Sequence, residues 1–211
     1  MSRFRRPYDA VKRVLDIVLS GAGLLVTLPI QILTAVAVLA SDGLPVLFRQ
    51  VRPGRHGQPF LLMKFRTMRP PKSGSVTDAD RLTELGRLLR ATSLDELPTL
   101  WNVLKGDMSL VGPRPLLMEY LELYTPEQAR RHEVRPGITG LAQVAGRNEV
   151  RWEDRFALDV EYVDTRSCIL DARILWQTLA TVTSRRGISE PGQATAAAFR
   201  GESKMAPDVQ A

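Results

Sequence analysis

Residues 17–40 read IVLSGAGLLVTLPIQILTAVAVLA, a long run without a single charged side chain. At about 1.5 Å of rise per residue, a helix of this length could cross the roughly 30 Å hydrocarbon core of a bilayer. A cleaved signal peptide fits poorly, because the run is too long and no small-residue cleavage site follows it. A chain of 211 residues could hardly bury such a helix on all sides. The run therefore predicts insertion into a membrane.

The flanks of this run favour a re-entrant segment over a spanning one. Lys and Arg are retained on the cytoplasmic side of membranes, so two basic flanks predict that both ends stay there. Pro29, near the middle, removes one helical hydrogen bond and leaves two short halves, as in a helix-break-helix hairpin. A kinked helix that spans the membrane is the alternative. The flanking bases are Arg3, Arg5, Arg6, Lys12 and Arg13 before the run, and Arg49, Arg52, Arg55, Lys64, Arg66 and Arg69 after it.

Composition narrows the class of protein. The chain is 44% hydrophobic and 25% charged, which suits a folded domain with a core. A single cysteine, Cys168, excludes an internal disulfide and a Cys-rich zinc site, and two histidines make a His-based metal cluster unexpected. The net charge of +6 is uneven, because residues 1–72 hold twelve Lys or Arg and three acids. This asymmetry predicts an anionic surface as the partner of the N-terminal third.

After the apolar run, the pattern predicts a β-hairpin followed by amphipathic helices. Residues 45–51 and 59–66 are strand-like and are separated by a glycine-containing turn. Residues 79–91 place four leucines on one helical face, and helical spacing recurs in later segments. We therefore expect an α+β fold, mainly α, with several amphipathic helices at the membrane interface. The expected divisions are residues 1–44 (basic segment and re-entrant helix), 45–183 (domain at the cytoplasmic face) and 184–211 (disordered tail).

Reactive residue types are densest in residues 92–115, TSLDELPTLWNVLKGDMSLVGPRP. Asp95 and Glu96 stand at a predicted helix start, where the helix dipole favours ionised carboxylates. Ser93 with Glu96 also fits a capping box, so the two acids could have a purely structural role at the start of the helix. Two adjacent acids can face an anionic substrate only if cations offset the repulsion. The nearby Arg87, Arg90 and Arg114 could supply that charge.

Two glycine- and proline-containing stretches suggest a phosphate site. Arg114 lies in Val-Gly-Pro-Arg-Pro, whose rigid backbone suits bidentate contact between guanidinium and phosphate, although a turn with a solvated arginine is a simpler alternative. Residues 135–140, RPGITG, precede Gln143 and Arg147, where glycines admit a ligand and polar side chains supply donors. There is no Walker A motif and no Rossmann fingerprint. The pattern indicates acids, arginines and a divalent ion around phosphates at a membrane face.

These motifs together resemble the bacterial sugar transferases, in the form of a small monotopic polyprenyl-phosphate phosphoglycosyl transferase. The resemblance runs from Lys12 to about Thr183, and Thr99 departs mildly from the family, which more often has glutamine there. The matching motifs are Lys12-Arg13-x-x-Asp16; Gln50-x-Arg52-x-Gly54 with Phe60 and Lys64-Phe65-Arg66-Thr67-Met68; Ser93–Pro98 through Gly112–Pro115; Arg135–Gly140 with Gly146–Asn148; and Asp159-x-x-Tyr162 with Asp171.

The resemblance implies a reaction in two steps. Asp95 would attack the β-phosphorus of a nucleotide-diphosphate sugar, usually a UDP-sugar, releasing UMP and leaving an aspartyl-phosphosugar. Polyprenyl phosphate would then take the sugar phosphate, at the cytoplasmic face of the bacterial inner membrane, to begin a surface glycan. Glu96 would help to hold Mg²⁺. Roles in binding substrate or phosphate are expected for Lys64, Arg66, Arg90, Arg114, Arg135, Gln143 and Arg147.

Features of the sequence also fit two other classes of protein. A pI near 9.9 suggests nucleic-acid binding, but the bases lie beside the apolar run and aromatics are only 6%, so no nucleic-acid partner is expected. A noncatalytic membrane-anchored scaffold, with residues 92–115 as a capped helix and turn, is the remaining alternative. Leucine-rich and aromatic helix faces leave room for a homodimer.

Overall fold

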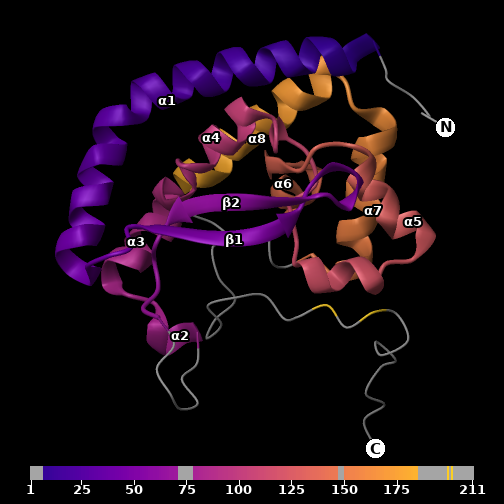
Figure 1. The fold of residues 1–211 in the computed structure, drawn as a ribbon. Coiled ribbons are helices and arrows are strands. Elements are labelled where there is room, and N and C mark those ends of the chain that lie inside the picture. The colour runs from indigo at the N-terminus through magenta and orange to yellow at the C-terminus, as the bar shows by residue number, and fades with distance from the viewer. Residues whose placement is uncertain (1–6, 71–77, 147–149, 185–198, 200, 202–211) are drawn as a thin grey trace, which may run out of the picture.

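The computed structural model describes residues 7–70, 78–146 and 150–184, together with Phe199 and Gly201. The described part is mainly helical, with α1 arching over the other elements and a β-hairpin crossing below it (Figure 1). The elements, with η for 3₁₀ helices, are α1 (Pro7–Asp42), β1 (Leu47–Pro53), η1 (Arg55–Gly57), β2 (Pro59–Phe65), α2 (Asp78–Arg81), α3 (Glu84–Thr92), η2 (Leu94–Glu96), α4 (Thr99–Lys105), β3 (Ser109–Val111), η3 (Met118–Glu122), α5 (Pro126–Ala129), η4 (Arg130–Glu133), β4 (Gly137–Thr139), α6 (Leu141–Gly146), α7 (Trp152–Thr165) and α8 (Cys168–Ser184).

The long helix α1 is continuous through Pro29, where an interruption was expected. It bends strongly along its length, so that its second half runs down the side of the molecule (Figure 1). Proline removes a single main-chain bond and bends a helix without ending it when the neighbouring turns hold. Around the proline, Thr27 Oγ1 donates to the Gly23 carbonyl over 2.6 Å, and Gln31 Nε2 donates to Thr27 Oγ1 over 2.9 Å. The helix-break-helix arrangement expected at Pro29 is therefore not observed, because α1 bends without ending there. The re-entrant topology stays a prediction.

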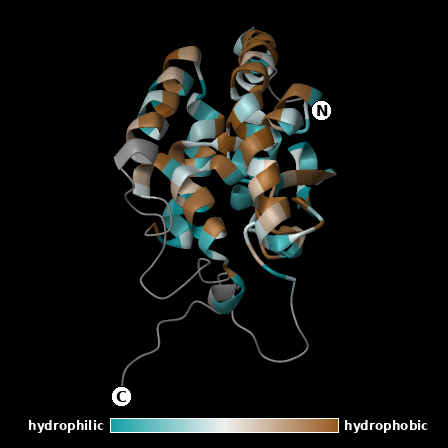
Figure 2. Ribbon diagram, turned by 90° about the vertical axis from the view of Figure 1, so that its left-hand side faces the viewer, coloured by the Kyte–Doolittle hydropathy of each residue, from teal (hydrophilic) through white to brown (hydrophobic). Residues whose placement is uncertain are grey.

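Most of α1 is apolar and exposed. By length and composition it could cross a membrane, and only 11% of its most apolar window is buried. Leu25 and Val26 are 75% and 78% exposed, unlike residues of a helix inside a soluble core. In Figure 2, hydrophobic residues run along the helical segments at the top of the molecule, where Figure 1 places α1. A membrane anchor explains this surface better than burial within the fold.

The first part of α1 is tied to the rest of the chain by polar contacts. Asp16 is 3% exposed and accepts hydrogen bonds from Ser109 Oγ and the Leu110 amide, both over 3.0 Å. Arg13 donates to the carbonyls of Val103 and Leu104, at the end of α4, over 2.7 and 2.9 Å. Such contacts satisfy carbonyl groups that a helix C-terminus leaves without partners. The anchor helix and the folded domain are thus joined directly.

A second polar joint lies where α1 meets α7 and α8. Asp171 of α8 pairs with Lys12 and accepts a hydrogen bond from Tyr8 Oη over 2.7 Å. Its other carboxylate oxygen accepts from Tyr162 Oη of α7 over 2.8 Å. Arg166 adds an ion pair with Asp9 over 2.8 Å. Basic and acidic residues of α1 therefore contribute to packing between helices.

The predicted β-hairpin is confirmed. Strands β1 and β2 pair antiparallel, with Phe48 opposite Lys64, Gln50 opposite Leu62 and Arg52 opposite Phe60. Residues directly opposite in such a pair point to the same face, and alternate residues of one strand share a face. Gln50, Arg52 and Lys64 therefore lie on one face of the hairpin, which is named here the inner face.

A short parallel pair of strands was not predicted. Ser109 in β3 lies opposite Gly137 in β4, and Val111 lies opposite Thr139. The glycines permit close contact between two main chains, because a Cβ on Gly137 would lie 2.1 Å from the Gly112 nitrogen. A Cβ on Gly140 would lie 2.2 Å from the Gly112 carbonyl oxygen. The glycines of residues 135–140 were expected to leave room for a ligand. In this structure they leave room for the main chain of the neighbouring strand.

Helix α8 exposes Ile169, Trp176 and Leu179, which are 83%, 73% and 63% exposed. These side chains are compatible with the expected interfacial helices, which remain a prediction.

The predicted tail, residues 184–211, lies outside the described residues apart from Ser184, Phe199 and Gly201. Phe199 is 3% exposed and packs against Phe156, with ring centroids 4.9 Å apart.

Candidate active site

Asp95 and Glu96 lie in the 3₁₀ turn η2, between α3 and α4. The turn is set by Ser93, whose φ of 57° ends α3 and redirects the chain. The capping box expected of Ser93 and Glu96 is absent in this described segment, since Ser93 makes no side-chain capping bond. The following helix α4 has Pro98 at its N-cap position, without a side-chain capping bond. The two acids are therefore not occupied in capping a helix.

Glu96 is held by two cations. Its Oε1 pairs with Lys64 Nζ from β2 and accepts from Arg114 Nη2 over 3.2 Å. Burial alone would raise the pKa of Glu96, but the charges and hydrogen bonds of Lys64 and Arg114 outweigh it and lower the pKa to about 2. Glu96 is therefore ionised across the physiological range of pH.

Asp95 differs from its neighbour. It is 8% exposed, and burial together with the charge of Glu96 raises the pKa of Asp95 to about 6, against the opposing charges of Lys64, Arg90 and Arg114. Within the described chain, no hydrogen bond to its carboxylate contributes to this pKa. Adjacent acids whose pKa values are pushed apart are typical of sites in which the two groups have different roles.

Arg90 reaches this site from the last turn of α3. Its Nε donates to Thr67 Oγ1 over 3.1 Å, which fixes α3 against the chain that follows β2. Gly86 allows this contact, because a Cβ there would lie 2.0 Å from the Thr67 carbonyl oxygen. The position of Arg90 therefore depends on a close approach between α3 and residue 67.

Arg114 is positioned by a residue that the sequence did not indicate. Arg131 donates from Nη2 to the Arg114 carbonyl over 2.8 Å and pairs with Asp159 over 2.6 Å. The side chains of Arg131 and Asp159 are only 1% and 2% exposed. The sequence contained the Asp159-x-x-Tyr162 motif, but nothing in the spacing linked Asp159 to Arg131. A buried ion pair thus supports the loop that carries Arg114.

The other predicted site residues lie in different surroundings. Arg66 donates to the Gly43 carbonyl over 2.6 Å at the end of α1, and Arg135 donates to the Gly106 carbonyl over 2.8 Å. Gln143 lies in α6, with its buried amide oxygen and nitrogen lacking partners within the described chain. Arg147 lies outside the described residues. The structure thus gathers a group of five around η2, namely Lys64, Arg90, Asp95, Glu96 and Arg114.

The residues present fit a magnesium ion that is held mainly by its substrate. The described ranges contain no cluster of three or more His, Cys, Asp or Glu side chains, so an all-protein cage is not formed there. Mg²⁺ in phosphate sites is commonly bound by one or two carboxylates together with substrate phosphates and water. Asp95 and Glu96 supply oxygen donors of this kind.

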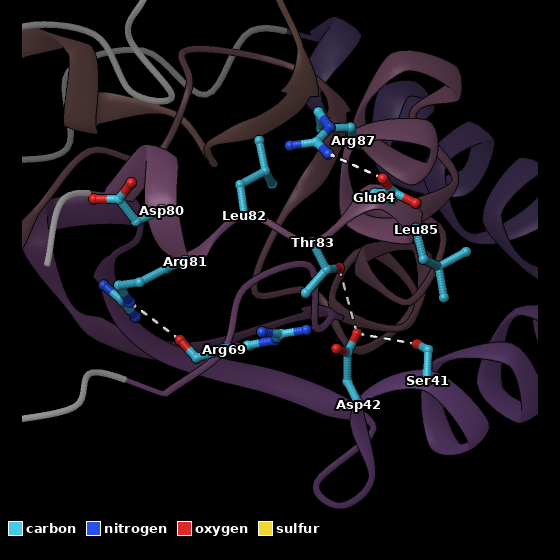
Figure 3. A pocket seen from close by; sticks show the side chains of 10 residues that line it. All are labelled: Ser41, Asp42, Arg69, Asp80, Arg81, Leu82, Thr83, Glu84, Leu85 and Arg87. Carbon is cyan, nitrogen blue, oxygen red and sulfur yellow. Dashed lines mark hydrogen bonds and ion pairs between the residues drawn. The ribbon is translucent and has the colours of Figure 1, made fainter.

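A cavity lies at the opposite end of α3. Its volume is about 500 Å³, and Figure 3 shows side chains from the end of α1 and the start of α3 around it. Thr83 Oγ1 donates to Asp42 Oδ2 over 3.4 Å across one side. Three acids face three arginines in this lining, so it has no excess of positive charge for a phosphate: Asp42, Asp80 and Glu84, with Arg69, Arg81 and Arg87. The group around η2 is the better candidate site.

The sequence is similar to those of known sugar transferases. Residues 7–185 match the family described as "Bacterial sugar transferase". The chain is 53% identical to the "Uncharacterized sugar transferase EpsL" of Bacillus subtilis over 194 residues, covering 90% of this chain and 96% of that protein. It is 44% identical to the "UDP-glucose:undecaprenyl-phosphate glucose-1-phosphate transferase" of Caulobacter vibrioides over 189 residues, covering 82% and 70% respectively.

A longer relative matches over a part of its length. The chain is 39% identical to the "Undecaprenyl-phosphate galactose phosphotransferase" of Salmonella typhimurium over 203 residues, covering 87% of this chain and 42% of that protein. The match to the family runs from the start of α1 to the end of α8, so it includes every residue of the group around η2. The chain therefore belongs to the bacterial sugar transferase family.

Proposed function

We propose that this protein transfers a sugar-1-phosphate from a UDP-sugar to polyprenyl (undecaprenyl) phosphate, releasing UMP and beginning the synthesis of an exopolysaccharide. The names of two relatives, from Caulobacter vibrioides and Salmonella typhimurium, support the acceptor and the reaction class. The observation that carries the proposal is the acid pair in η2, with one carboxylate bound by cations and the other free of hydrogen bonds from the described chain.

Asp95 acts as the nucleophile in the first step. One of its oxygens forms a bond to the β-phosphorus, and the bond from that phosphorus to the bridging oxygen breaks, with its electron pair leaving on UMP. With a pKa of about 6, Asp95 is mostly ionised at neutral pH yet more basic than an ordinary aspartate. Lys64, Arg90 and Arg114, whose charges act on Asp95, contact the phosphate oxygens and offset the repulsion between two anions.

The second step returns the enzyme to its starting state. A phosphate oxygen of polyprenyl phosphate attacks the same phosphorus, and the bond to Asp95 breaks, leaving the carboxylate and a polyprenyl-diphosphate sugar. Glu96 would help to hold a magnesium ion on the donor diphosphate in the first step, and this ion would supply charge neutralisation for the departing UMP. Glu96 stays ionised throughout, because its pKa of about 2 lies far below the working range.

The acceptor is a membrane lipid, which fits the exposed apolar surface of α1. We place α1 in the inner membrane with both ends at the cytoplasmic face, where nucleotide sugars are available. The basic flanks on both sides of the helix support this arrangement. Exposed Trp176 on α8 suits the membrane–water interface, where tryptophan is enriched.

The covalent intermediate is the direct test. The protein, purified in detergent, is mixed with a panel of UDP-sugars without acceptor and examined by intact-protein mass spectrometry. With the correct sugar, wild type should gain the mass of one phosphosugar and release one UMP, and Asp95→Asn should do neither. Asp154→Asn, in an exposed pair with Arg151, is the matched control and should react as wild type does. Full turnover by Asp95→Asn would contradict the assignment of Asp95 as the nucleophile. A wild-type protein that neither forms the adduct nor releases UMP with any donor would favour the noncatalytic scaffold instead.

A further inference from the structure

Two residues on the inner face of the hairpin have no role in the reaction described above. Gln50 and Arg52 lie on the same face of β1 as Lys64 lies on β2, by the register of the hairpin. Lys64 contacts Glu96 at one end of this face, and Arg52 lies four residues along β1 from the position opposite Lys64. Arg52 thus lies on the same face of the hairpin as Lys64, farther from η2.

The guanidinium of Arg52 is held in place by neutral groups. Its Nε and Nη2 both donate to Gln50 Oε1, over 3.0 and 2.6 Å, and its Nη1 donates to the Pro115 carbonyl over 3.4 Å. In the described chain no carboxylate pairs with Arg52. An amide oxygen can orient a guanidinium, but it leaves the positive charge uncompensated. Arg52 is therefore fixed in direction and ready to bind an anion.

Arg114 lies close enough to Arg52 for their charges to interact. Burial lowers the pKa of Arg52, and the charge of Arg114 lowers it further. The carboxylate that contacts Arg114 is Glu96, which is shared with Lys64. The cations Lys64, Arg90, Arg114 and Arg52 thus outnumber the acids Asp95 and Glu96. A half-buried excess of positive charge of this kind is relieved when an anion binds between the arginines.

We propose that Arg52 and Arg114 form a second phosphate-binding position beside the Asp95–Glu96 pair, with Gln50 as the residue that orients Arg52. A phosphate group there would accept hydrogen bonds from two guanidinium forks, while the reacting phosphorus lies at Asp95. Its source is either the second phosphate of the donor or the phosphate of the polyprenyl acceptor. This assignment of the source rests on the proposed function, whereas the binding of phosphate itself does not.

Three variants test this position. Arg52→Gln removes the charge, and Gln50→Glu keeps the shape of residue 50 while giving Arg52 an acidic partner. Arg49→Gln is the matched control, because Arg49 is exposed on the opposite face of the same strand. Thermal unfolding in detergent checks that each variant is folded. Should Arg52→Gln unfold, Gln50→Glu still tests the proposal, because it retains every side-chain atom of Arg52.

The first measurement is binding of inorganic pyrophosphate and of UMP by calorimetry. Arg52→Gln and Gln50→Glu should each weaken pyrophosphate binding by about tenfold or more, as expected for loss of a charged, bidentate contact. Arg49→Gln should bind as wild type does. Equal affinities in wild type and all three variants would overturn the proposal, even if the covalent intermediate is found.

The second measurement separates the two sources of phosphate. Adduct formation without acceptor reports the donor, and the KM for polyprenyl phosphate at saturating donor reports the acceptor. A raised donor concentration for half-maximal adduct formation assigns the position to the donor, and a raised acceptor KM assigns it to the lipid. If neither the donor concentration for half-maximal adduct formation nor the acceptor KM changes, Arg52 has no role in turnover. If wild type itself forms no adduct, the proposed function fails, and the pyrophosphate measurement still decides the binding position.

Discussion

Arg131 donates a hydrogen bond of 2.8 Å from its Nη2 to the main-chain carbonyl oxygen of Arg114. The same guanidinium is bound to Asp159 of α7, so α7 is connected to the loop that presents Arg114 to Glu96. Tyr124 and Phe156 lie against Arg131, at 5.7 and 5.6 Å from its guanidinium carbon to the ring centroids. The direction of Arg114 is therefore set by a buried network outside the site.

Breaking this network should cost both stability and activity. Asp159→Asn leaves the buried charge of Arg131 without an anionic partner, so the free energy of unfolding should fall by about 3–5 kcal/mol. Denaturant unfolding in detergent measures this loss. Asp154→Asn, in a surface pair, should cost no more than about 1 kcal/mol. Similar losses in the two variants would show that the Arg131–Asp159 pair has no special role.

The pKa of Asp95 predicts the dependence of adduct formation on pH. Only the ionised carboxylate attacks phosphorus, so the rate should rise with pH through about 6 and then level off. The folded-state pKa lies above the ordinary value of 3.8, so this group lowers stability as pH rises from about 4 to 6. Asp95→Asn should therefore raise the free energy of unfolding at pH 7.5 by about 3 kcal/mol while abolishing the adduct. A rate that is constant from pH 5 to 8 would contradict the assignment.

The joint between α1 and α8 should be a major source of stability. Asp171→Asn removes the anionic partner of Lys12 and weakens the contacts to Tyr8 and Tyr162, so the free energy of unfolding should fall by about 2–4 kcal/mol. Thermal denaturation and limited proteolysis in detergent measure the change. Glu127→Gln, which alters an exposed pair with Arg130, serves as the control and should change stability by less than about 1 kcal/mol.

The topology of α1 can be tested by labelling. Single cysteines at Ala10, before the apolar run, and at His56, in the exposed turn of the hairpin, are introduced after Cys168→Ser. In intact cells a membrane-impermeant thiol reagent should label neither position, and permeabilised cells should be labelled at both. Labelling of either cysteine from outside an intact cell would establish a spanning helix and refute the re-entrant one.

Patterns that are local in sequence predicted much of this structure. The two strand-like segments predicted the hairpin close to its observed bounds, and the uncharged run predicted the apolar part of α1, although the helix begins ten residues earlier, at Pro7. The leucine spacing over residues 79–91 predicted a single helix, whereas the structure has two, α2 and α3, separated at Leu82 and Thr83. Asp95, Glu96 and Arg90 lie within a few residues of one another, so a turn brings them together. Lys64 and Arg114 come from more distant segments. Their place in the site was predicted from the order of the family motifs along the chain.

Contacts between distant segments could not be predicted, because the type of a single residue does not indicate which distant residue it will contact. The pairing of β3 with β4 depends on glycines that meet across the two strands, and Arg131 looks like an ordinary basic residue until its burial is seen. Ser93 fitted a capping pattern, but its left-handed conformation excludes that role. Pro29 was expected to divide the apolar run into two short helices, whereas α1 is continuous through it.

Gly23 of α1 lies against Leu100 of α4, so closely that a methyl group on the glycine would come within 3.3 Å of the leucine. Helix α4 begins directly after the turn that holds the two acids. The vertical position of the acid pair is therefore coupled to that of α1. With α1 in the bilayer and Asp95 as nucleophile, as proposed, a change in bilayer thickness that moved the helix would carry the reacting carboxylate with it toward or away from the lipid headgroups.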